Sequence, residues 1–284
     1  AHVPERIAPG KAIEELTGFP RVVGGVGPKS TGKAVELYSI VNSKLMPADA
    51  TTAEFVKLIE NTFRDLNIAY ANFLALLAER LGIDVYEAIK LANTHPRVNI
   101  HMPGAGVGGP CLTKDPYLLI EKHRDVYGAE LIQLSRRINE YMPSHVVSMV
   151  LRSLSVNGID PSKAKVAVLG VTYKGDVDDV RESPSKHIVG KLLEKVSEVV
   201  VYDPYSSEAF GGKRASTLEE AVSKADVVVI ATDHKEFKGI DLPKLKELVN
   251  NPIIVDGRRV VDPYKAFSHG FKYYGVGFGK VVKL

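Results

Sequence analysis

From about residue 158 onward, short runs of β-branched residues alternate with segments of helical character, and this alternation constrains the fold more than any other feature. Such runs are typical of parallel strands, because the connecting helices bury both faces of the sheet. Strands are expected at 165–171, 198–202, 226–231, 253–255 and 272–276. Helices are expected to begin near Pro184, Thr217 and Pro243. The pattern predicts a doubly wound, Rossmann-like α/β domain over 158–284.

The segment 49–157 carries helical periodicity instead. Thr51 and Glu54 have the spacing of a capping box, and Gly82 is a typical helix stop. Between them lies an apolar stripe at helical spacing, made of Phe55, Ile59, Phe63, Leu66, Tyr70, Phe73, Leu77 and Leu81. About 30 residues at 1.5 Å each predict a helix roughly 45 Å long.

A helix of that length, apolar over much of its circumference, needs cover on more than one side. A homodimer interface would supply this cover, and a larger core within the chain is the alternative. The region 49–157 is therefore predicted to be an all-helical dimerisation domain.

The remaining helices of this region are delimited by capping residues and prolines. Asp84 with Glu87 predicts a helix that ends near Asn93, because the following His95-Pro96 cannot continue it. Residues 95–116 are expected to form a glycine- and proline-rich loop. Two more helices should follow, the second restarting at Pro143, since proline suits a first helical turn.

The first 48 residues have the pattern of the end of an α/β unit. A strand is expected at 21–25, a helix at 33–41 and a short extended piece at 42–46. The chain opens inside a motif, without the charged-then-apolar pattern of a signal peptide. We therefore expect residues 1–48 to be the remnant of an N-terminal Rossmann domain.

Composition narrows the class of protein. The 37 basic and 34 acidic residues leave a net charge of only +3, without the clustered cations of a nucleic-acid-binding surface. No apolar run is long enough to span a bilayer. The single cysteine, Cys111, cannot form an intramolecular disulfide, which fits a reducing compartment. These features predict a cytoplasmic, soluble protein with no nucleic-acid or membrane partner.

Two glycine patterns fail on their context. The run from Gly27 to Ala34 approaches a P-loop, but Ala34 replaces the Ser/Thr that binds Mg²⁺ and Pro28 removes a cradling N–H. The run from Gly104 to Gly109 satisfies G-x-G-x-x-G, but no strand leads into it. Neither run is interpreted as a nucleotide fingerprint.

The turn from Gly170 to Asp176 is better placed, because it follows a strand at the edge where doubly wound sheets bind phosphates. Lys174 and Arg181 flank it and could contact a phosphate. The alternative is an ordinary turn with solvated charges.

Cys111 lies in the glycine-rich loop, with Lys114 and Asp115 just beyond. Glycine lets the backbone approach a ligand, and nearby cations favour the thiolate, so Cys111 is a candidate nucleophile. The alternative is a small buried hydrophobic residue.

Lys57 and Asn61 are spaced i, i+4 and share one helix face. An ammonium and an amide side by side could stabilise an oxyanion, although two solvated positions would show the same spacing. The eight histidines show no metal-ligand spacing, and no metal site is expected. His95 and His101 are interpreted as loop or phosphate contacts.

Taken together, these residues resemble the UDP-glucose/GDP-mannose dehydrogenase family. The matching stretches are Pro4-Glu5-Arg6 with Pro9-Gly10, Glu54-x-x-Lys57-x-x-x-Asn61, Gly108-Gly109-Pro110-Cys111-x-x-x-Asp115, Tyr173-Lys174-x-Asp176-x-x-Asp179-x-Arg181-Glu182-Ser183-Pro184 and Asp256-Gly257-Arg258-Arg259. They keep the family's order along the whole chain. Pro110 is a local departure from close relatives.

The resemblance implies a three-part enzyme with an N-terminal NAD domain, a central dimerisation region and a C-terminal UDP-sugar domain. Most of the first part is expected to be missing here, so that this chain alone should neither hold NAD nor turn over. The segments 95–100 and 64–69 favour UDP-N-acetylmannosamine as the substrate. UDP-glucose, UDP-N-acetylglucosamine or GDP-mannose are the alternatives. A non-catalytic dimeric UDP-sugar-binding module is another, and a cysteine hydrolase using Cys111 and His101 a remote one.

The resemblance also implies roles. Cys111 would attack the C6 aldehyde, Lys57 and Asn61 would stabilise oxyanions, Asp115 would transfer protons, and Glu5 would position or activate water. The implied contacts of the nucleotide sugar are Arg6, Arg97, His101, Gly104, Gly106, Gly108, Lys174, Arg258 and Arg259. Arg181 would reach the NAD pyrophosphate.

Overall fold

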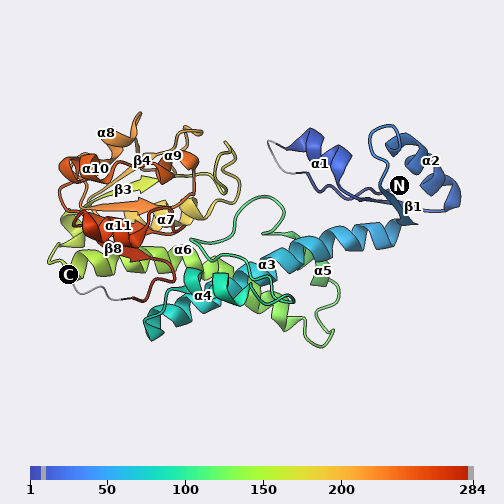
Figure 1. Ribbon diagram of the computed structural model, residues 1–284, viewed down its shortest axis with the longest axis horizontal. Coiled ribbons are helices and arrows are strands. Elements are labelled where there is room, and N and C mark those ends of the chain that lie inside the picture. The colour runs from blue at the N-terminus through green and yellow to red at the C-terminus, as the bar shows by residue number, and fades with distance from the viewer. Residues whose placement is uncertain (8–10, 281–284) are drawn as a thin grey trace. The chain divides into compact units, whose positions relative to one another are not determined.

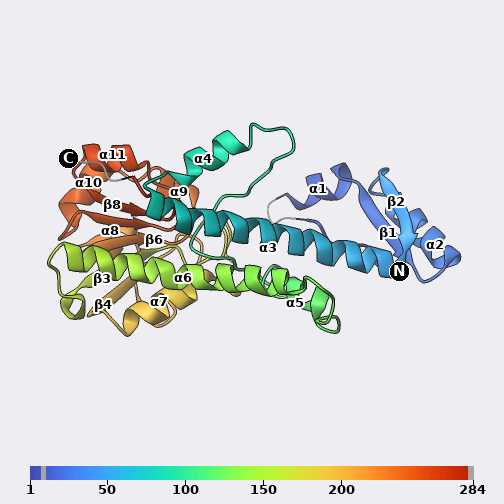
Figure 2. The same cartoon turned by 90° about the horizontal axis from the view of Figure 1, so that it is seen from below.

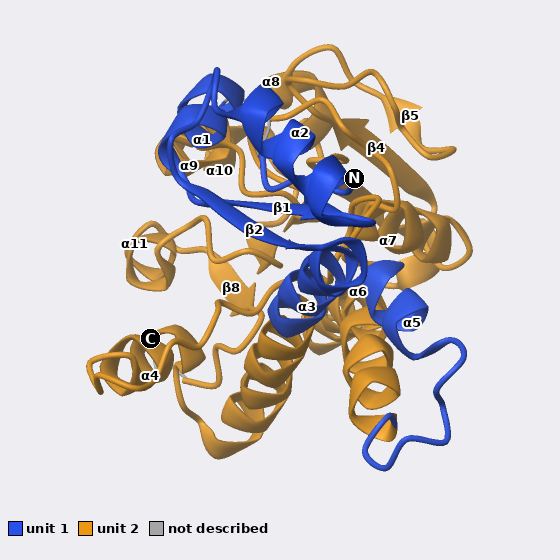
Figure 3. Cartoon of the chain, turned by 90° about the vertical axis from the view of Figure 1, so that its right-hand side faces the viewer, with its two compact units in different colours: residues 1–64, 114–129 blue, residues 65–113, 130–284 orange. Residues whose placement is uncertain are grey.

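The computed structural model describes residues 1–7 and 11–280. The chain divides into two compact units, coloured separately in Figure 3. Unit 1 comprises residues 1–64 and 114–129, and unit 2 comprises residues 65–113 and 130–284. The division into domains at 1–48, 49–157 and 158–284 stays a prediction.

Unit 1 contains a β-α-β unit formed by β1 (Arg21–Gly25), α2 (Pro28–Tyr38) and β2 (Leu45–Asp49). The two strands are parallel. Unit 1 also contains α1 (Ala12–Gly18), α5 (Asp115–Ile120) and residues 50–64 of the long helix described next. The strand expected at 21–25 is confirmed. Helix α2 begins earlier than expected, because Pro28 fits its first turn and the Ser30 hydroxyl accepts from the Gly27 N–H at 3.0 Å.

The long helix α3 (Ala50–Leu81) has 32 residues, as the apolar stripe predicts. The predicted capping box at Thr51 and Glu54 is wrong, because Asp49 is the residue that caps the helix. Its Oδ1 accepts from the Thr52 N–H at 2.8 Å and its Oδ2 from the Thr52 hydroxyl at 2.6 Å. The stop at Gly82 is confirmed by its φ of 70°, which a side chain would strain.

Two helices of unit 2 follow the sequence pattern to different degrees. Helix α4 (Val85–Ala92) is capped by Asp84, which accepts from the Tyr86 N–H, as expected. Helix α6 (Glu130–Val156) runs through Pro143 instead of restarting there. That prediction is wrong because Pro143 is buried inside the helix, where an added Cβ on Gly106 would lie 3.1 Å from its ring. Contacts with the neighbouring loop therefore outweigh the lost helical hydrogen bond.

The C-terminal part of unit 2 is a six-stranded parallel sheet of order β5-β4-β3-β6-β7-β8. The strands are β3 (Lys165–Leu169), β4 (Glu198–Tyr202), β5 (Lys213–Arg214), β6 (Val227–Ile230), β7 (Ile253–Asp256) and β8 (Lys272–Gly275). In chain order this is the 3-2-1-4-5-6 arrangement of the Rossmann fold, with its switch point between β3 and β6. All five expected strands are confirmed, and only the two-residue β5 was not expected.

Helices cover both faces of this sheet, as Figures 1 and 2 show for unit 2. Alternate strand residues face two hydrophobic clusters, for example Val166 and Val168 on one side and Ala167 and Leu169 on the other. Helices α6 and α7 (Pro184–Leu193) cover the first face. The second face is covered by α8 (Leu218–Val222), α9 (Lys235–Lys238), α10 (Leu242–Leu248) and α11 (Pro263–Ser268). A short 3₁₀ helix, Pro161–Lys163, precedes β3. The doubly wound prediction is confirmed.

An ion pair is buried between α3 and α6. Arg136 Nη1 lies 2.6 Å from Asp65 Oδ1, and the two side chains are 2% and 1% exposed. Burial raises the pKa of Asp65, and the guanidinium of Arg136 opposes that rise. The charge of Asp65 therefore depends on its partner.

We expect Arg136→Met to lower the free energy of unfolding by about 3–5 kcal/mol, because it leaves the Asp65 carboxylate buried without its cation. Urea titration would measure this loss. The double variant Asp65→Asn/Arg136→Met should lose less than Arg136→Met alone, since it removes the unpaired charge. Equal losses in the two variants would contradict this account, and Glu140→Gln, at an exposed partner of Arg136, serves as the control.

Candidate functional site

The glycine-rich loop of unit 2 is held from within the protein along much of its length. No strand leads into it, since residues 101–114 contain only bends and turns. The Gly104 N–H donates to Asn72 Oδ1 at 2.9 Å, and the Gly106 carbonyl accepts from Arg258 Nη2 at 3.2 Å. The Thr113 hydroxyl donates to the Gly109 carbonyl at 2.8 Å. The loop is therefore a fixed structure.

This loop packs against the segment that follows β3. A Cβ on Gly108 would lie 2.6 Å from the Glu182 carbonyl, and one on Gly109 would lie 2.9 Å from the Tyr173 ring. The Gly109 N–H donates to the Arg181 carbonyl at 3.0 Å. Gly109 also has a φ of 90°. The glycines thus allow the loop to approach the carboxyl edge of the sheet, where doubly wound folds bind ligands.

Cys111 lies in a turn at the end of this loop and is exposed. The alternative of a buried hydrophobic cysteine does not hold. Hydrogen bonding and ion pairing with Asp179 raise the pKa of Arg181, and Cys111 adds a smaller contribution in the same direction. An exposed thiol therefore lies within electrostatic range of the Arg181 guanidinium.

The turn after β3 depends on Asp203 and His234. Asp203 Oδ2 accepts from the Val171 and Thr172 N–H groups at 2.7 and 3.2 Å. His234, 0% exposed, accepts at Nδ1 from the Asp176 N–H, so its Nε2 carries the proton and faces Asp203 Oδ2 at 3.0 Å.

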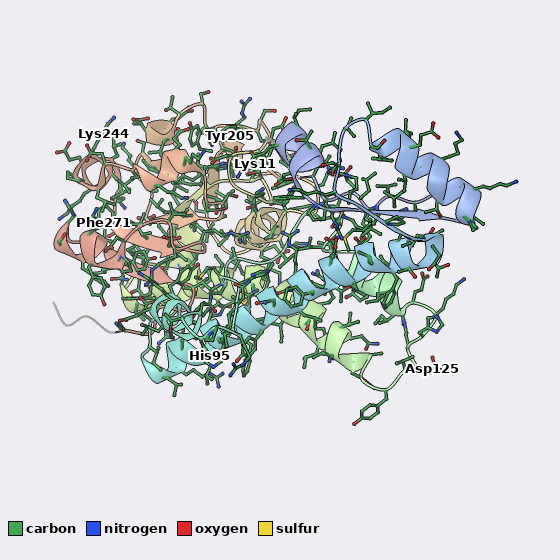
Figure 4. All side chains as sticks on the ribbon, turned by 45° about the vertical axis from the view of Figure 1, so that its right-hand side comes forward. Lys11, His95, Asp125, Tyr205, Lys244 and Phe271 are labelled. Atoms are coloured by element: carbon green, nitrogen blue, oxygen red, sulfur yellow. The ribbon has the colours of Figure 1, made fainter. Side chains whose placement is uncertain are left out.

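These contacts fix the charge of Asp203. Burial acts to raise the pKa of Asp203, but hydrogen bonds from His234 and from the backbone hold it below its ordinary value. Tyr205, labelled in Figure 4, stacks on His234 with ring centroids 5.0 Å apart. Lys174 lies on this supported turn and is exposed.

Arg258 and Arg259 have different surroundings. Arg258 Nε donates to the Ala231 carbonyl at 3.2 Å, so Arg258 links the end of β6 to the glycine loop. Arg259 pairs with Asp84, and its guanidinium lies over the rings of Tyr86 and Phe278. Arg181 pairs with Asp179 at 2.6 Å while remaining 67% exposed.

The loop after α4 is closed by two asparagines. Asn93 donates to and accepts from Ile100, both at 2.8 Å, and Asn67 Oδ1 accepts from the His101 N–H at 2.7 Å. Arg97 is exposed, and its backbone N–H donates to His95 Nδ1 at 3.3 Å (His95 is labelled in Figure 4).

Unit 1 brings together other predicted site residues. Asn61 Nδ2 donates to Asp115 Oδ2 at 2.6 Å, and Asn61 is only 5% exposed, so it is not a solvated position. Lys57 Nζ donates to the Glu5 carbonyl. Glu5 Oε1 accepts from the Ile7 N–H at 2.7 Å. Within unit 1, Asn61 and Asp115 thus form a side-chain pair, whereas Lys57 is held by the backbone of Glu5.

Arg6 is bound within the same unit. Its guanidinium pairs with Glu60 and donates to the Pro20 carbonyl at 2.8 Å. The predicted motif residues Pro9 and Gly10 lie outside the described residues.

Over residues 1–7 and 11–280, no group of three or more His, Cys, Asp or Glu side chains could hold a metal ion. Within the same described ranges, no helix is both long and apolar enough to cross a membrane.

The sequence did not point to Asp203, His234 and Asn72. Asp203 and His234 hydrogen-bond to the turn after β3, and Asn72 hydrogen-bonds to the glycine loop. Asp203 could have been found, because an acidic residue directly after the second strand is a recognised feature of Rossmann sheets. Asn72 and His234 carry no such local signal.

Comparison with known proteins agrees with this geometry. Residues 51–141 match the central domain of the UDP-glucose/GDP-mannose dehydrogenase family, and residues 167–263 match its UDP binding domain. The chain is 47% identical over 282 residues to UDP-N-acetyl-D-mannosamine dehydrogenase of Pyrococcus horikoshii, covering 99% of this chain and 65% of that one. It is 45% identical to the enzyme of the same name from Methanocaldococcus jannaschii, covering 99% of this chain and 64% of the relative.

Solved structures of nucleotide-sugar dehydrogenases also superpose on this chain. That of the Pyrococcus horikoshii UDP-N-acetylmannosamine dehydrogenase superposes with a TM-score of 0.91 at 46% identity, over 99% of this chain and 65% of the other. A UDP-glucose dehydrogenase from Pyrobaculum islandicum superposes with a TM-score of 0.85 at 28% identity, over 97% and 63%. The chain thus spans just under two thirds of these relatives. It belongs to the UDP-glucose/GDP-mannose dehydrogenase family.

Proposed function

We propose that the protein to which these 284 residues belong carries out the NAD-dependent, four-electron oxidation of UDP-N-acetyl-D-mannosamine at C6, giving UDP-N-acetyl-D-mannosaminuronate. One observation carries the proposal. Unit 2 holds an exposed thiol, Cys111, on a rigid loop packed against the carboxyl edge of a Rossmann-type sheet. A nucleophile beside a nucleotide-binding edge suits covalent chemistry on a nucleotide sugar.

The nucleotide sugar is proposed to bind along this edge. Lys174 is exposed on the turn after β3, Arg258 holds the loop at Gly106, and Arg97 is exposed after α4. Cations of this kind can contact the two phosphates. The close packing at Gly104, Gly106 and Gly108 leaves the loop backbone as the wall of the site.

The Cys111 thiolate is proposed to add to the C6 aldehyde produced by the first two-electron oxidation, forming a C–S bond and a thiohemiacetal. Oxidation of the thiohemiacetal gives a thioester, and water then cleaves its C–S bond, releasing the carboxylate and the thiol. The exposed thiol fits a reducing compartment such as the cytoplasm.

The residues of unit 1 are assigned supporting roles in this scheme. Lys57 and the buried Asn61 would donate to the oxyanions of the adduct and the thioester intermediate. Asp115, hydrogen-bonded to Asn61, would transfer protons, and Glu5 would position or activate the water.

NAD supplies the oxidant for both two-electron steps when it is bound to the complete enzyme. Residues 1–48 do not fit a full dinucleotide site. Their described part has only two strands, and the amides of Gly25 and Gly27 at the β1–α2 turn already donate to Thr31 and Ser30. We propose that the main NAD site is formed by chain outside these 284 residues, with residues 1–48 as the end of that domain and Arg181 as a contact from unit 2.

The choice of sugar rests on the relatives. Six relatives at 40–47% identity, from Pyrococcus, Methanocaldococcus and Methanococcus, are UDP-N-acetyl-D-mannosamine dehydrogenases. A Ralstonia relative at 37% identity is an NDP-N-acetyl-D-galactosaminuronic acid dehydrogenase. UDP-N-acetylmannosamine is therefore proposed ahead of other sugars.

We expect the complete protein to release two NADH per UDP-N-acetylmannosamine, since each oxidation step reduces one NAD. The measurement is NADH absorbance with UDP-glucose, UDP-N-acetylglucosamine and GDP-mannose in parallel. The 284-residue chain serves as a control that should release none. Two NADH from a rival sugar only would change the substrate, and none from any sugar would indicate a binding module.

We expect Cys111→Ser in the complete protein to lower uronate formation by at least about a thousandfold, because a neutral hydroxyl is a far weaker nucleophile than a thiolate. Product analysis by mass spectrometry would follow the uronate. Binding of UDP by the variant, measured by calorimetry, should match the wild type and controls for folding. Uronate formation at the wild-type rate would contradict the proposed role of Cys111.

We also propose that α3 forms a homodimer interface. On the part of α3 within unit 2, Tyr70, Phe73 and Leu77 share one face and are 51%, 48% and 41% exposed. Long helices with apolar residues on their solvent side are typical of subunit interfaces. A second copy of this chain is the proposed occupant of this face.

We expect Phe73→Arg to convert the dimer into a monomer, because it would bury an unpaired charge in the interface. Light scattering coupled to size exclusion would give the mass. Leu91→Arg is the matched control, since Leu91 is 62% exposed on α4, and it should stay dimeric. Dissociation of both variants, or of neither, would contradict an interface on α3.

A further inference from the structure

A chain of hydrogen bonds buried between α3 and α6 reaches the backbone of the glycine loop. The Gly104 N–H donates to Asn72 Oδ1 at 2.9 Å, and Asn72 Nδ2 donates to Asn139 Oδ1 at 2.9 Å. Asn139 Nδ2 donates to Asp65, to Oδ1 at 2.7 Å and to the carbonyl at 3.0 Å. The chain thus ends on the carboxylate of α3.

The same carboxylate is the starting point of a second branch. Arg136 Nη1 donates to Asp65 Oδ1 at 2.6 Å and makes a longer contact with the Leu112 carbonyl at 3.4 Å. Leu112 is the residue directly after Cys111. The network therefore holds the loop at Gly104, before the thiol, and at Leu112, beyond it.

Each amide in the network has only one possible orientation. A backbone N–H can only donate, so Asn72 must present its oxygen to Gly104 and its nitrogen to Asn139. Asn139 must then accept with its oxygen and direct its nitrogen to Asp65. The carboxylate, which only accepts, ends the sequence. A break at any member would leave a buried donor or acceptor unsatisfied.

Burial makes the network rigid. Asn72, Asn139, Asp65 and Arg136 are 0%, 1%, 1% and 2% exposed, so water cannot replace a lost partner at the surface. Within the described residues, Asp65 Oδ2 and Arg136 Nε have no hydrogen-bond partner, so the arrangement is fixed by the bonds that join the four side chains to one another and to the loop.

We propose that Asn72, Asn139, Asp65 and Arg136 are positioning residues that fix the turn from which the Cys111 thiol meets its electrophile. This inference deepens the proposed function, on which it rests. Asn72 and Arg136 contact the loop backbone directly, and Asn139 and Asp65 act on the loop through them.

The single cysteine makes the inference directly measurable, because any thiol label on the folded chain reports Cys111 alone. Asn72→Leu keeps the branched shape of the side chain and removes both of its hydrogen bonds. We expect its rate constant for alkylation by iodoacetamide to move at least threefold from the wild-type value toward that of the urea-unfolded chain. The assay is run at a temperature where the variant is fully folded by circular dichroism.

Val150→Ala is the matched control, because Val150 is fully buried on α6 and has no part in the network. It lowers stability by a cavity and should leave the labelling rate at the wild-type value. An unchanged rate in Asn72→Leu, or an equal shift in Val150→Ala, would overturn the inference.

Two further measurements keep the inference testable if Asn72→Leu does not fold. In the wild-type chain, the Gly104 amide should exchange its hydrogen at least a hundredfold more slowly than the exposed amide of Tyr127, and exchange at an equal rate would overturn the inference. In the complete protein, Asn139→Leu should lower kcat at least tenfold while KM for the nucleotide sugar changes less than threefold. A Cys111→Ser variant that retains full activity would refute the proposed function, whereas the labelling result would still decide on the network.

Discussion

The charge of Asp65 is the constraint on which unit 2 depends. A carboxylate removed from water costs several kcal/mol unless strong donors surround it. Here Arg136 and Asn139 provide them from another helix, so the carboxylate sets the register of α6 against α3. Helix α6 in turn covers one face of the parallel sheet through Val146 and Val150. One buried charge therefore aligns the long helix, the sheet and the loop that carries Cys111.

The fold could be predicted where buried segments carry apolar residues in a regular pattern. Strands β3, β4, β6 and β7 are covered on both faces, so their β-branched runs identified them, whereas β8 was identified by its two tyrosines, which are also typical of strands. Strand β5 has only two residues, both exposed, and therefore shows no apolar pattern. Pro143 and the cap at Asp49 were both misjudged. In both cases the sequence offered a local boundary signal that the structure does not use: Pro143 packs against the glycine loop inside α6, and Asp49 caps α3 through Thr52 in place of Thr51.

The sequence pointed only to the residues to which a chemical role is proposed. Cys111, Lys174 and Arg181 stand out because their residue types and motifs are unusual. The residues that support them do not, because an asparagine in a helix gives no indication of its partner. Asn72 and Asn139 lie 67 positions apart, and only the packing of α3 on α6 brings their amides together. Arg6 and Arg259 show the opposite case. Both belong to family motifs, yet each is ion-paired with an acidic side chain of this chain, Glu60 and Asp84.

The contacts of Asp203 bear on whether a phosphate can bind to the amides that follow β3. The sheet has the strand order of a dinucleotide-binding domain, and the amides after its first strand would ordinarily face a pyrophosphate. In this chain the amides of Val171 and Thr172 already hold the Asp203 carboxylate, which His234 secures from the other side. A phosphate bound at these two amides would have to displace the Asp203 carboxylate and leave a buried imidazole without its acceptor. The domain thus has the strand order of a cofactor site, with an internal carboxylate on the two amides that a pyrophosphate would otherwise contact.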